Sequence, residues 1–212
     1  LVTNPFIGCN KEFKIVQGKE LAKTMKKWSS VKKFTDEEVE EEKLEKIFEL
    51  TTKAPTAFNL QPYRFIVLDS EEAMKKATSS VVPVNGWIRY ADKIVVLVGD
   101  EDIDVNADKV LEHKLEENRI DEEKAENLRK MYSDYKNRGE EFMTGWLTRN
   151  TVIPGTFFML ACKTQGIGSC PVRGFDQDKL SDKLDLKDSE RPILIFPIGY
   201  PKEEERNWRR HL

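Results

Sequence analysis

The pattern of apolar and polar positions in the first third of the chain predicts a helix followed by a strand. Apolar residues recur near helical spacing at Val39, Leu44, Ile47 and Phe48. Thr35 and Glu38 have the spacing of a capping box at the start of this helix. The helix is expected to end before Pro55, because the residue that precedes a proline resists helical backbone angles. The segment "RFIVLD" (64–69) then predicts a strand.

Three further apolar segments predict strands. The run "DKIVVLVGD" (92–100) is nearly continuous and β-branched, which is typical of a strand that is covered on both faces. "IGSCPVRGF" (167–175) predicts a short strand that runs into a turn, and "RPILIFPIGYP" (191–201) predicts the last strand.

Three helices are predicted between these strands. Ser70 is suited to cap a short helix over 71–77, and Asp176 is suited to cap another. The segment 146–166 has the pattern of a buried helix that ends at Gly166. Pro154 lies inside that segment and is expected either to kink the helix or to mark its first turn.

The segment 101–145 is dominated by charged residues. Its apolar positions are sparse and include Leu111, Leu115, Leu128 and Tyr132. It could form a disordered linker or two exposed helices, and the near absence of glycine and the absence of proline favour the helices. Strands and helices otherwise alternate without a compositional break. We therefore predict one domain over 1–212, with helices packed over a central sheet and a charged helical insert at about 101–145.

Composition restricts the classes of function. The net charge is −3 with 34% charged residues, so bulk electrostatics do not favour binding to nucleic acid. The three cysteines, Cys9, Cys162 and Cys170, form no CxxC motif, which disfavours a disulfide framework or a zinc ribbon and favours a reducing compartment. The sequence has only two histidines, His113 and His211, which disfavours a His-rich metal site or a Ser-His-Asp triad. No metal is expected.

The sequence also bears on the compartment. The first fifteen residues have neither the basic start nor the long apolar core of a signal peptide. The longest apolar stretches are interrupted by proline and glycine and are too short to span a bilayer. The sequence therefore predicts a cytoplasmic protein without a membrane partner.

One connection with almost no charge, "APTAFNLQPYRF" (54–65), stands out among four polar or special stretches. It combines Pro55 and Pro62 with the neutral amides Asn59 and Gln61 and with three aromatic residues. Such a loop is expected to be stiff and to contact something flat or neutral. The other stretches are "WSSVKKF" (28–34), "PVRGF" (171–175) and "ERNWRRHL" (205–212), and each of them alone is a weak signal.

Taken in order, these stretches resemble the nitroreductase family of flavoproteins. The segment from "SSVKKF" through "APTAFNLQPYRFIVLD" is similar to the start of the family, and "GIGSCPVRGFD" with "RPILIFPIGYP" is similar to its second half. The similarity covers about residues 25 to 210. It implies an α+β fold, a three-layer α/β/α sandwich with a central, mostly antiparallel sheet. It also implies a homodimer that binds FMN non-covalently at the subunit interface and takes electrons from NADH or NADPH.

The resemblance assigns cofactor contacts residue by residue. Ser30 and Lys32 match the family's phosphate and pyrimidine contacts, with Lys32 as the cation near flavin N1 and O2. The backbone of Arg173 and Gly174 would pass beside N5, where glycine permits close approach. The complete cofactor-binding set is Trp28, Ser29, Ser30, Lys32, Pro55, Thr56, Ala57, Asn59, Gln61, Asn85, Pro171, Val172, Arg173, Gly174, Arg209 and Arg210.

The resemblance also explains the 54–65 connection. In the family this loop lies beside the flavin of the partner subunit. Pro55, Thr56 and Ala57 would pack at the flavin edge, while Asn59 and Gln61 would fix the loop by hydrogen bonds. A stiff connection of this kind loses little entropy when it is held in place.

Some positions depart from the family pattern. Trp28 stands where the family usually has an arginine, and Ser29 stands where it often has arginine or histidine. One phosphate cation is therefore missing, and either Lys26 or Lys27 replaces it or Trp28 belongs to the core. Thr56 and its neighbour Ala57 also replace a Ser-Ser or Ser-Gly pair.

The function implied is that of an FMN-dependent enzyme. NAD(P)H would reduce the flavin at N5, and a nitroaromatic, quinone or related small-molecule acceptor would then be reduced on the same face, with no catalytic side chain required. The alternatives are a non-catalytic flavin-binding or interaction protein of the same fold, for which Trp28 is the main support, and a reductive dehalogenase or flavin-modifying relative. No glycine-rich dinucleotide motif indicates which nicotinamide is preferred.

Overall fold

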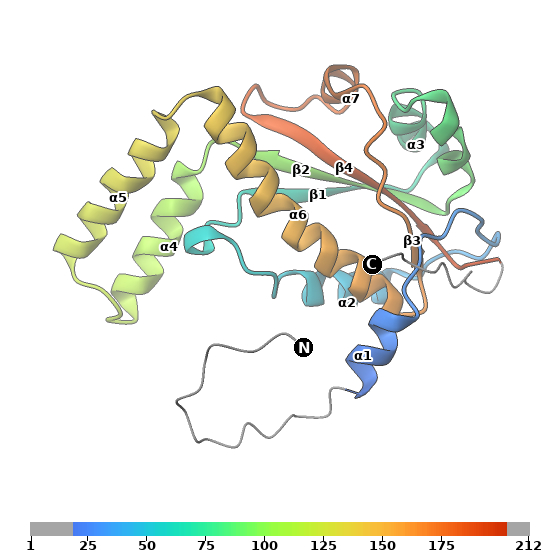
Figure 1. The fold of residues 1–212 in the computed structure, drawn as a ribbon, viewed down its shortest axis with the longest axis horizontal. Coiled ribbons are helices and arrows are strands. Elements are labelled where there is room, and N and C mark those ends of the chain that lie inside the picture. The colour runs from blue at the N-terminus through green and yellow to red at the C-terminus, as the bar shows by residue number, and fades with distance from the viewer. Residues whose placement is uncertain (1–18, 203–212) are drawn as a thin grey trace, which may run out of the picture.

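A four-stranded antiparallel sheet with helices on both faces forms the centre of the computed structural model, which describes residues 19–202 (Figure 1). The strands are β1 (Tyr63–Leu68), β2 (Lys93–Asp100), β3 (Gly168–Ser169) and β4 (Glu190–Gly199). Their order in the sheet is β1-β2-β4-β3, and every neighbouring pair is antiparallel. All four strands fall where the sequence predicted them, and the antiparallel sheet confirms the predicted α+β fold.

Seven α-helices and two 3₁₀ helices lie within the described part of the chain. They are α1 (Lys19–Lys26), α2 (Glu41–Thr51), η1 (Ala57–Asn59), α3 (Glu71–Thr78), η2 (Pro83–Tyr90), α4 (Asp104–Glu116), α5 (Glu122–Lys136), α6 (Glu140–Thr164) and α7 (Gln177–Lys183). Within residues 19–202, none of the helices is both long enough and apolar enough to cross a membrane.

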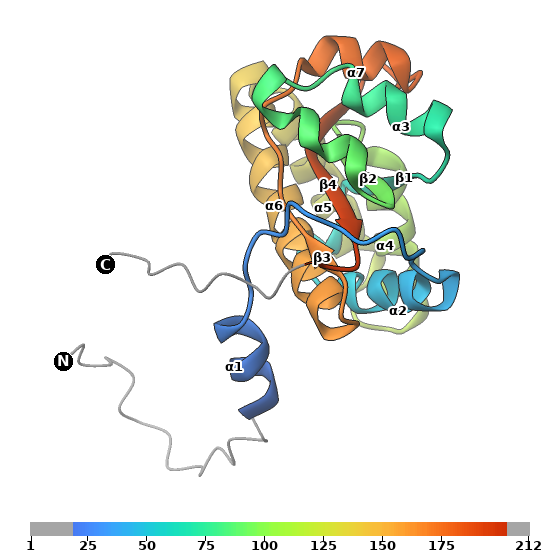
Figure 2. The ribbon, with the colours of Figure 1, turned by 90° about the vertical axis from the view of Figure 1, so that its right-hand side faces the viewer.

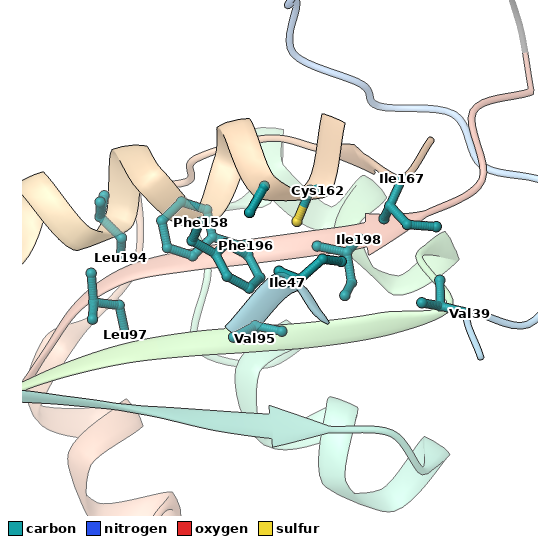
Figure 3. Packing of buried hydrophobic residues seen from close by; sticks show 11 residues of the cluster. Val39, Ile47, Val95, Leu97, Phe158, Cys162, Ile167, Leu194, Phe196 and Ile198 are labelled. Atoms are coloured by element: carbon teal, nitrogen blue, oxygen red, sulfur yellow. The ribbon is translucent and has the colours of Figure 1, made fainter. Parts of the chain in front are cut away.

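The sheet is buried on both faces because its central strands alternate their apolar side chains between two cores. Val95 and Leu97 of β2 pack with residues of α2 and α6, including Phe158, on one face (Figure 3). Ile94 and Val96 of the same strand pack on the opposite face with residues of α3, η2 and α7. Figure 2 shows α3 and α7 side by side on this face. This arrangement accounts for the continuous apolar run of β2 and produces the three layers.

Two of the predicted helix caps are confirmed. The Ser70 hydroxyl accepts a hydrogen bond of 3.2 Å from the Ala73 amide at the start of α3. The Asp176 carboxylate accepts one of 3.0 Å from the Lys179 amide at the start of α7. Each of these side chains satisfies a backbone donor that the first helical turn leaves free.

The predicted capping box is wrong. The helix begins at Glu41 and its N-cap residue is Glu40, which makes no side-chain capping bond. Thr35 lies too far upstream to cap it. Its amide donates a hydrogen bond of 2.8 Å to the carbonyl of Tyr200, beyond the end of β4. That partner is distant in sequence, so a local motif could not indicate it.

The long helix α6 extends beyond its predicted start. Its first turns contain the buried residues Met143 and Trp146, which pack against the α4–α5 hairpin. Pro154 therefore lies in the helix interior rather than in the first turn. At the other end, Gly166 follows the C-cap with φ of +75°, which confirms the predicted glycine stop.

The segment 101–145 contains the two helices that were favoured over a linker. Figure 1 shows α4 and α5 side by side, beyond one end of the sheet. Leu111 and Tyr132 are buried between them, together with Trp146 of α6. A small apolar cluster of its own therefore holds this charged hairpin against the rest of the fold.

Candidate functional site

Ser30 and Lys32 lie on an extended segment at one edge of the sheet. The Val31 amide donates a hydrogen bond of 3.1 Å to the carbonyl of Ser169 in β3. The backbones approach this closely because Gly168 has no side chain: a Cβ there would lie 2.8 Å from the Val31 side chain. Val31 is buried while Ser30 and Lys32 are exposed, as expected for alternating positions of extended chain.

Two side chains that the sequence did not assign lie beside this segment. The Lys32 ammonium nitrogen is 5.6 Å from the centre of the Trp87 ring, which is within the range of a cation–π contact. Cys170 lies close enough for the Ser30 hydroxyl to hydrogen-bond its sulfur. Burial raises the pKa of the Cys170 thiol, and Ser30 and the charge of Lys32 partly oppose that rise. Cys170 is 5% exposed, so its sulfur is poorly accessible as a nucleophile.

The 171–175 stretch continues along the same edge. Val172 forms an isolated bridge with Ile195 of β4. The Asn85 side-chain amide donates a hydrogen bond of 3.1 Å to the Gly174 carbonyl. A Cβ on Gly174 would lie 2.7 Å from Nδ2 of Asn85, so the missing side chain here admits the neighbouring η2 segment. The resemblance assigned the absence of a side chain at Gly174 to close approach of the flavin. In this structure it allows close packing against Asn85 of the same chain.

Backbone donors remain available at this edge. Among the described residues, no acceptor is found for the amides of Arg173 and Gly174, and the Arg173 side chain is exposed. We call the residues 30–32, 85–87 and 168–174 together the β3 edge. It offers two exposed cations, Lys32 and Arg173, and two amide donors with no partner among the described residues.

Trp28 occupies the position at which the resemblance expects a phosphate-binding cation. Trp28 and Ser29 are half-buried, and the Trp28 amide donates a hydrogen bond of 3.3 Å to the Met25 carbonyl at the end of α1. Arg209 and Arg210, the other predicted phosphate contacts, lie outside the described residues. Their assignment stays a prediction.

The 54–62 loop is fixed by hydrogen bonds, but mostly not through the amide side chains that were predicted to fix it. The Ala57 amide donates a hydrogen bond of 2.7 Å to Oδ1 of Asn150 in α6. The Thr56 hydroxyl accepts one of 3.0 Å from the Gln61 amide, and the Asn106 side chain donates one of 3.1 Å to the Gln61 carbonyl. The Gln61 side chain makes only a local bond of 3.3 Å to the Asn59 carbonyl.

The loop backbone is unusual at three residues without glycine. Phe58, Asn59 and Gln61 have φ values of 56°, 63° and 46°, in the left-handed region. This conformation is uncommon for a bulky residue such as Phe58 and is retained only where surrounding contacts impose it. The Phe58 ring lies 5.4 Å from that of Tyr132 and 6.0 Å from that of Tyr135. Packing against the α4–α5 hairpin therefore holds the loop in one conformation.

Two clefts adjoin these regions. One, of about 760 Å³, lies beside the β3 edge and is lined by Lys32, Lys33, Phe34, Thr35, Asp36, Arg89, Tyr90, Ala91, Asp92 and Lys202. The other, of about 250 Å³, lies between the 54–62 loop and α4 and is lined by Asn59, Gln61, Lys109, Val110, His113, Lys114 and Arg119.

The 54–62 loop and the part of the β3 edge that carries Ser30 and Lys32 lie at opposite ends of the sheet. The loop leads into Tyr63, which pairs with Gly99 at one end of β2. Ser169 pairs with Ile198, which in turn pairs with Lys93 at the other end of β2. Six residues at ~3.3 Å each separate the level of Tyr63 from that of Ser169 by about 20 Å along β2. Val172 lies about halfway, since it bridges Ile195, the partner of Val96. One copy of the chain therefore does not bring the 54–62 loop and the segment that carries Ser30 and Lys32 together.

Comparison with known proteins places these features in a family. A sequence profile described as the nitroreductase family matches residues 25–200. MhqN of Bacillus subtilis, named provisionally as an NAD(P)H nitroreductase, is 27% identical over 172 residues, which are 79% of this chain and 82% of that protein. A nitroreductase family protein from Streptococcus pneumoniae has a crystal structure with a TM-score of 0.79 and 26% identity, covering 91% of this chain and 96% of that one.

A further solved structure is similar in fold and contains a cofactor. It is a nitroreductase-type protein from Exiguobacterium sibiricum in complex with FMN, with a TM-score of 0.77 and 19% identity, covering 90% of this chain and 92% of that one. At this identity the likeness concerns the fold alone.

Proposed function

The chain belongs to the nitroreductase family, and from this premise we propose that it is an FMN-dependent oxidoreductase that uses NADH or NADPH to reduce a nitroaromatic, quinone or related small acceptor. The observation that supports this most directly is the donor set of the β3 edge. Lys32 is exposed beside Ser30, and the amides of Arg173 and Gly174 have no acceptor among the described residues. These are the groups that one edge of a flavin requires.

Each of these groups has a role that its chemistry supports. Bound FMN would accept a hydride from the nicotinamide and pass it to the acceptor. Lys32 would hold a positive charge beside the pyrimidine end of the ring, where negative charge accumulates on reduction. The amides of Arg173 and Gly174 would orient the ring edge by hydrogen bonds. The side chains contribute orientation and charge, and none has to transfer a proton.

We further propose that the site is completed by a second copy of the chain. The 54–62 loop is about 20 Å along β2 from the segment that carries Ser30 and Lys32, so it would serve the flavin of the partner. Helix α6 presents Val152, Ile153 and Phe157 to solvent, each 36–39% exposed, and the adjacent α1 exposes Leu21 and Met25. Exposed apolar residues concentrated on neighbouring helices are typical of an interface. A twofold dimer would bury this surface and form two equivalent sites.

The colour of the purified protein tests the proposed function. An FMN enzyme should be yellow, and its flavin absorbance should bleach under anaerobic conditions when NADH or NADPH is added and return when a quinone is added. A colourless protein that FMN cannot reconstitute would overturn the proposal. A yellow protein that neither nicotinamide reduces would favour the non-catalytic flavin-binding alternative, which Trp28 supports because it removes a phosphate cation.

A further inference from the structure

The cleft between the 54–62 loop and α4 has a strongly cationic lining. Four of its seven lining residues are basic or histidine, and no aspartate or glutamate lines it. The whole chain, in contrast, has a net charge of −3. A concave surface of one sign raises the local concentration of ligands of the opposite sign. The lining therefore favours an anion.

Two of these cations have no carboxylate partner. Glu117 forms an ion pair of 2.7 Å with Arg119, whose charge it partly compensates, and lies 3.4 Å from the His113 ring nitrogen. For Lys109 and Lys114, no ion pair exists with any residue between 19 and 202. Two ammonium groups on one small cleft repel each other, and a bound anion would relieve that repulsion.

The opposite wall of the cleft offers neutral hydrogen-bond donors. Asn59 and Gln61 line it, and the Asn59 side chain makes no hydrogen bond within the described part of the chain. The two walls are tied together, because Asn106 of α4 donates its 3.1 Å hydrogen bond to the Gln61 carbonyl. Ammonium and amide donors held in fixed positions suit the oxygens of a phosphoryl group.

We infer that this cleft binds a phosphoryl group of the nicotinamide dinucleotide that reduces the flavin. The inference rests on the proposed function, in which the same loop lies beside the flavin of the partner subunit. The nicotinamide ring must then stack nearby, and its charged portion must find cations within reach. At about 250 Å³ the cleft is smaller than the pockets of ~300–1,000 Å³ that enclose whole ligands. It therefore suits one end of the dinucleotide.

The phosphoryl group has two possible sources, which an experiment separates. The pyrophosphate is common to NADH and NADPH, whereas the 2′-phosphate occurs only in NADPH. We would measure flavin reduction by stopped flow, with FMN-loaded dimer, for wild type and for the double variant Lys109→Gln, Lys114→Gln. The dissociation constant should rise by about fivefold for each lysine replaced. The limiting rate should stay unchanged.

The pattern of weakening identifies the source. If the double variant binds only NADPH more weakly, the cleft binds the 2′-phosphate. If it binds both dinucleotides more weakly to the same extent, the cleft binds the pyrophosphate. Lys130→Gln is the matched control, because Lys130 is exposed like Lys109 and has no ion pair in the described residues, but lies on α5 outside the cleft. It should leave both constants at the wild-type value. Unchanged constants in the double variant would overturn the inference.

A variant that is expected to bind the dinucleotide more tightly provides a second test. Glu117→Gln releases Arg119 and His113 from their carboxylate, so it should tighten dinucleotide binding by up to about fivefold. Calorimetric titration with 2′,5′-adenosine diphosphate and with 5′-AMP gives a readout that does not depend on turnover. Weaker binding in Glu117→Gln would contradict the assignment. If the wild-type flavin is reduced by neither dinucleotide, the proposed function fails and this inference fails with it.

Discussion

The amide of Ala57 donates a hydrogen bond of 2.7 Å to Oδ1 of Asn150, which joins the 54–62 loop to the middle of α6. Asn150 is 6% exposed, and its side-chain nitrogen donates a second bond of 2.9 Å to the Trp146 carbonyl. Both the oxygen and the nitrogen of the Asn150 side chain therefore have a hydrogen-bond partner. The loop is positioned by the same helix that carries the exposed apolar residues Ile153 and Phe157.

Replacing Asn150 should loosen the loop. Asn150→Ala leaves the half-buried Ala57 amide without its acceptor, which should lower the free energy of unfolding by about 1–3 kcal/mol. FMN affinity should fall as well, because the loop is proposed to border the flavin. Urea denaturation and FMN titration measure the two effects. Thr148→Ala is the control, since the exposed Thr148 hydroxyl only donates to the Thr144 carbonyl of its own helix. Equal stability of the two variants would argue against the positioning role.

Lys32 should affect the redox state more than the fold. Removing its charge in Lys32→Met destabilises the reduced flavin, so the midpoint potential should fall, by about 30–60 mV if the contact is worth ~1.5–3 kcal/mol. Reduction by NAD(P)H should be slower and the melting temperature nearly unchanged. Lys53→Met, at an exposed position just after the end of α2, should leave the potential at its wild-type value. A folded Lys32→Met variant with an equal or higher potential would refute the assigned role.

Arg209 should distinguish FMN from riboflavin, because only FMN carries a phosphate. Loss of a charge-assisted contact in Arg209→Ala is worth about 1.5–3 kcal/mol, or about one to two decades in FMN affinity. Riboflavin affinity should not change. Fluorescence titration of the apoprotein with each flavin measures this difference. Equal weakening of both flavins would show that Arg209 is not at the phosphate.

Protonation of Glu190 should contribute to the loss of stability of the protein in acid. This buried carboxylate accepts hydrogen bonds of 2.6 and 3.0 Å from Arg64 and one of 3.1 Å from the Lys187 amide. The bonds to Arg64 hold its pKa below the usual value, although burial opposes them. Because the folded pKa lies below the unfolded one of about 4.3, the ionised pair stabilises the fold above that pH. This contribution is lost as the pH falls through the folded pKa.

A Glu190→Gln variant tests that assignment. It should be less stable than wild type at neutral pH, and its free energy of unfolding should decline less steeply below about pH 4. Urea denaturation across this range gives the slopes. Identical slopes in the two proteins would exclude Glu190 as a source of acid sensitivity.

Local patterns were sufficient to predict much of the fold. Ser70 and Asp176 each cap the helix that begins with the next residue, and Gly166 ends α6, because each of these features depends only on nearby residues. The strand β2 was recognisable because both of its faces are buried. The position of Val31 was not predictable, since its backbone partner is Ser169, a residue far along the chain.

The candidate site was predictable only in part for the same reason. The resemblance indicated Lys32 and the 54–62 loop, but neither Asn150 nor Trp87 carried a local signal of its contacts with them. The left-handed backbone of Phe58 arises from packing against α5, which no local pattern reports.

The central claim is that each flavin site forms between two copies of the chain. It is tested most directly by size-exclusion chromatography with light scattering and flavin absorbance recorded on the same peak. Our account predicts the mass of a dimer, twice the 24.6 kDa of one chain, with one FMN for each chain. A peak at the mass of the monomer that retains one FMN for each chain would contradict it.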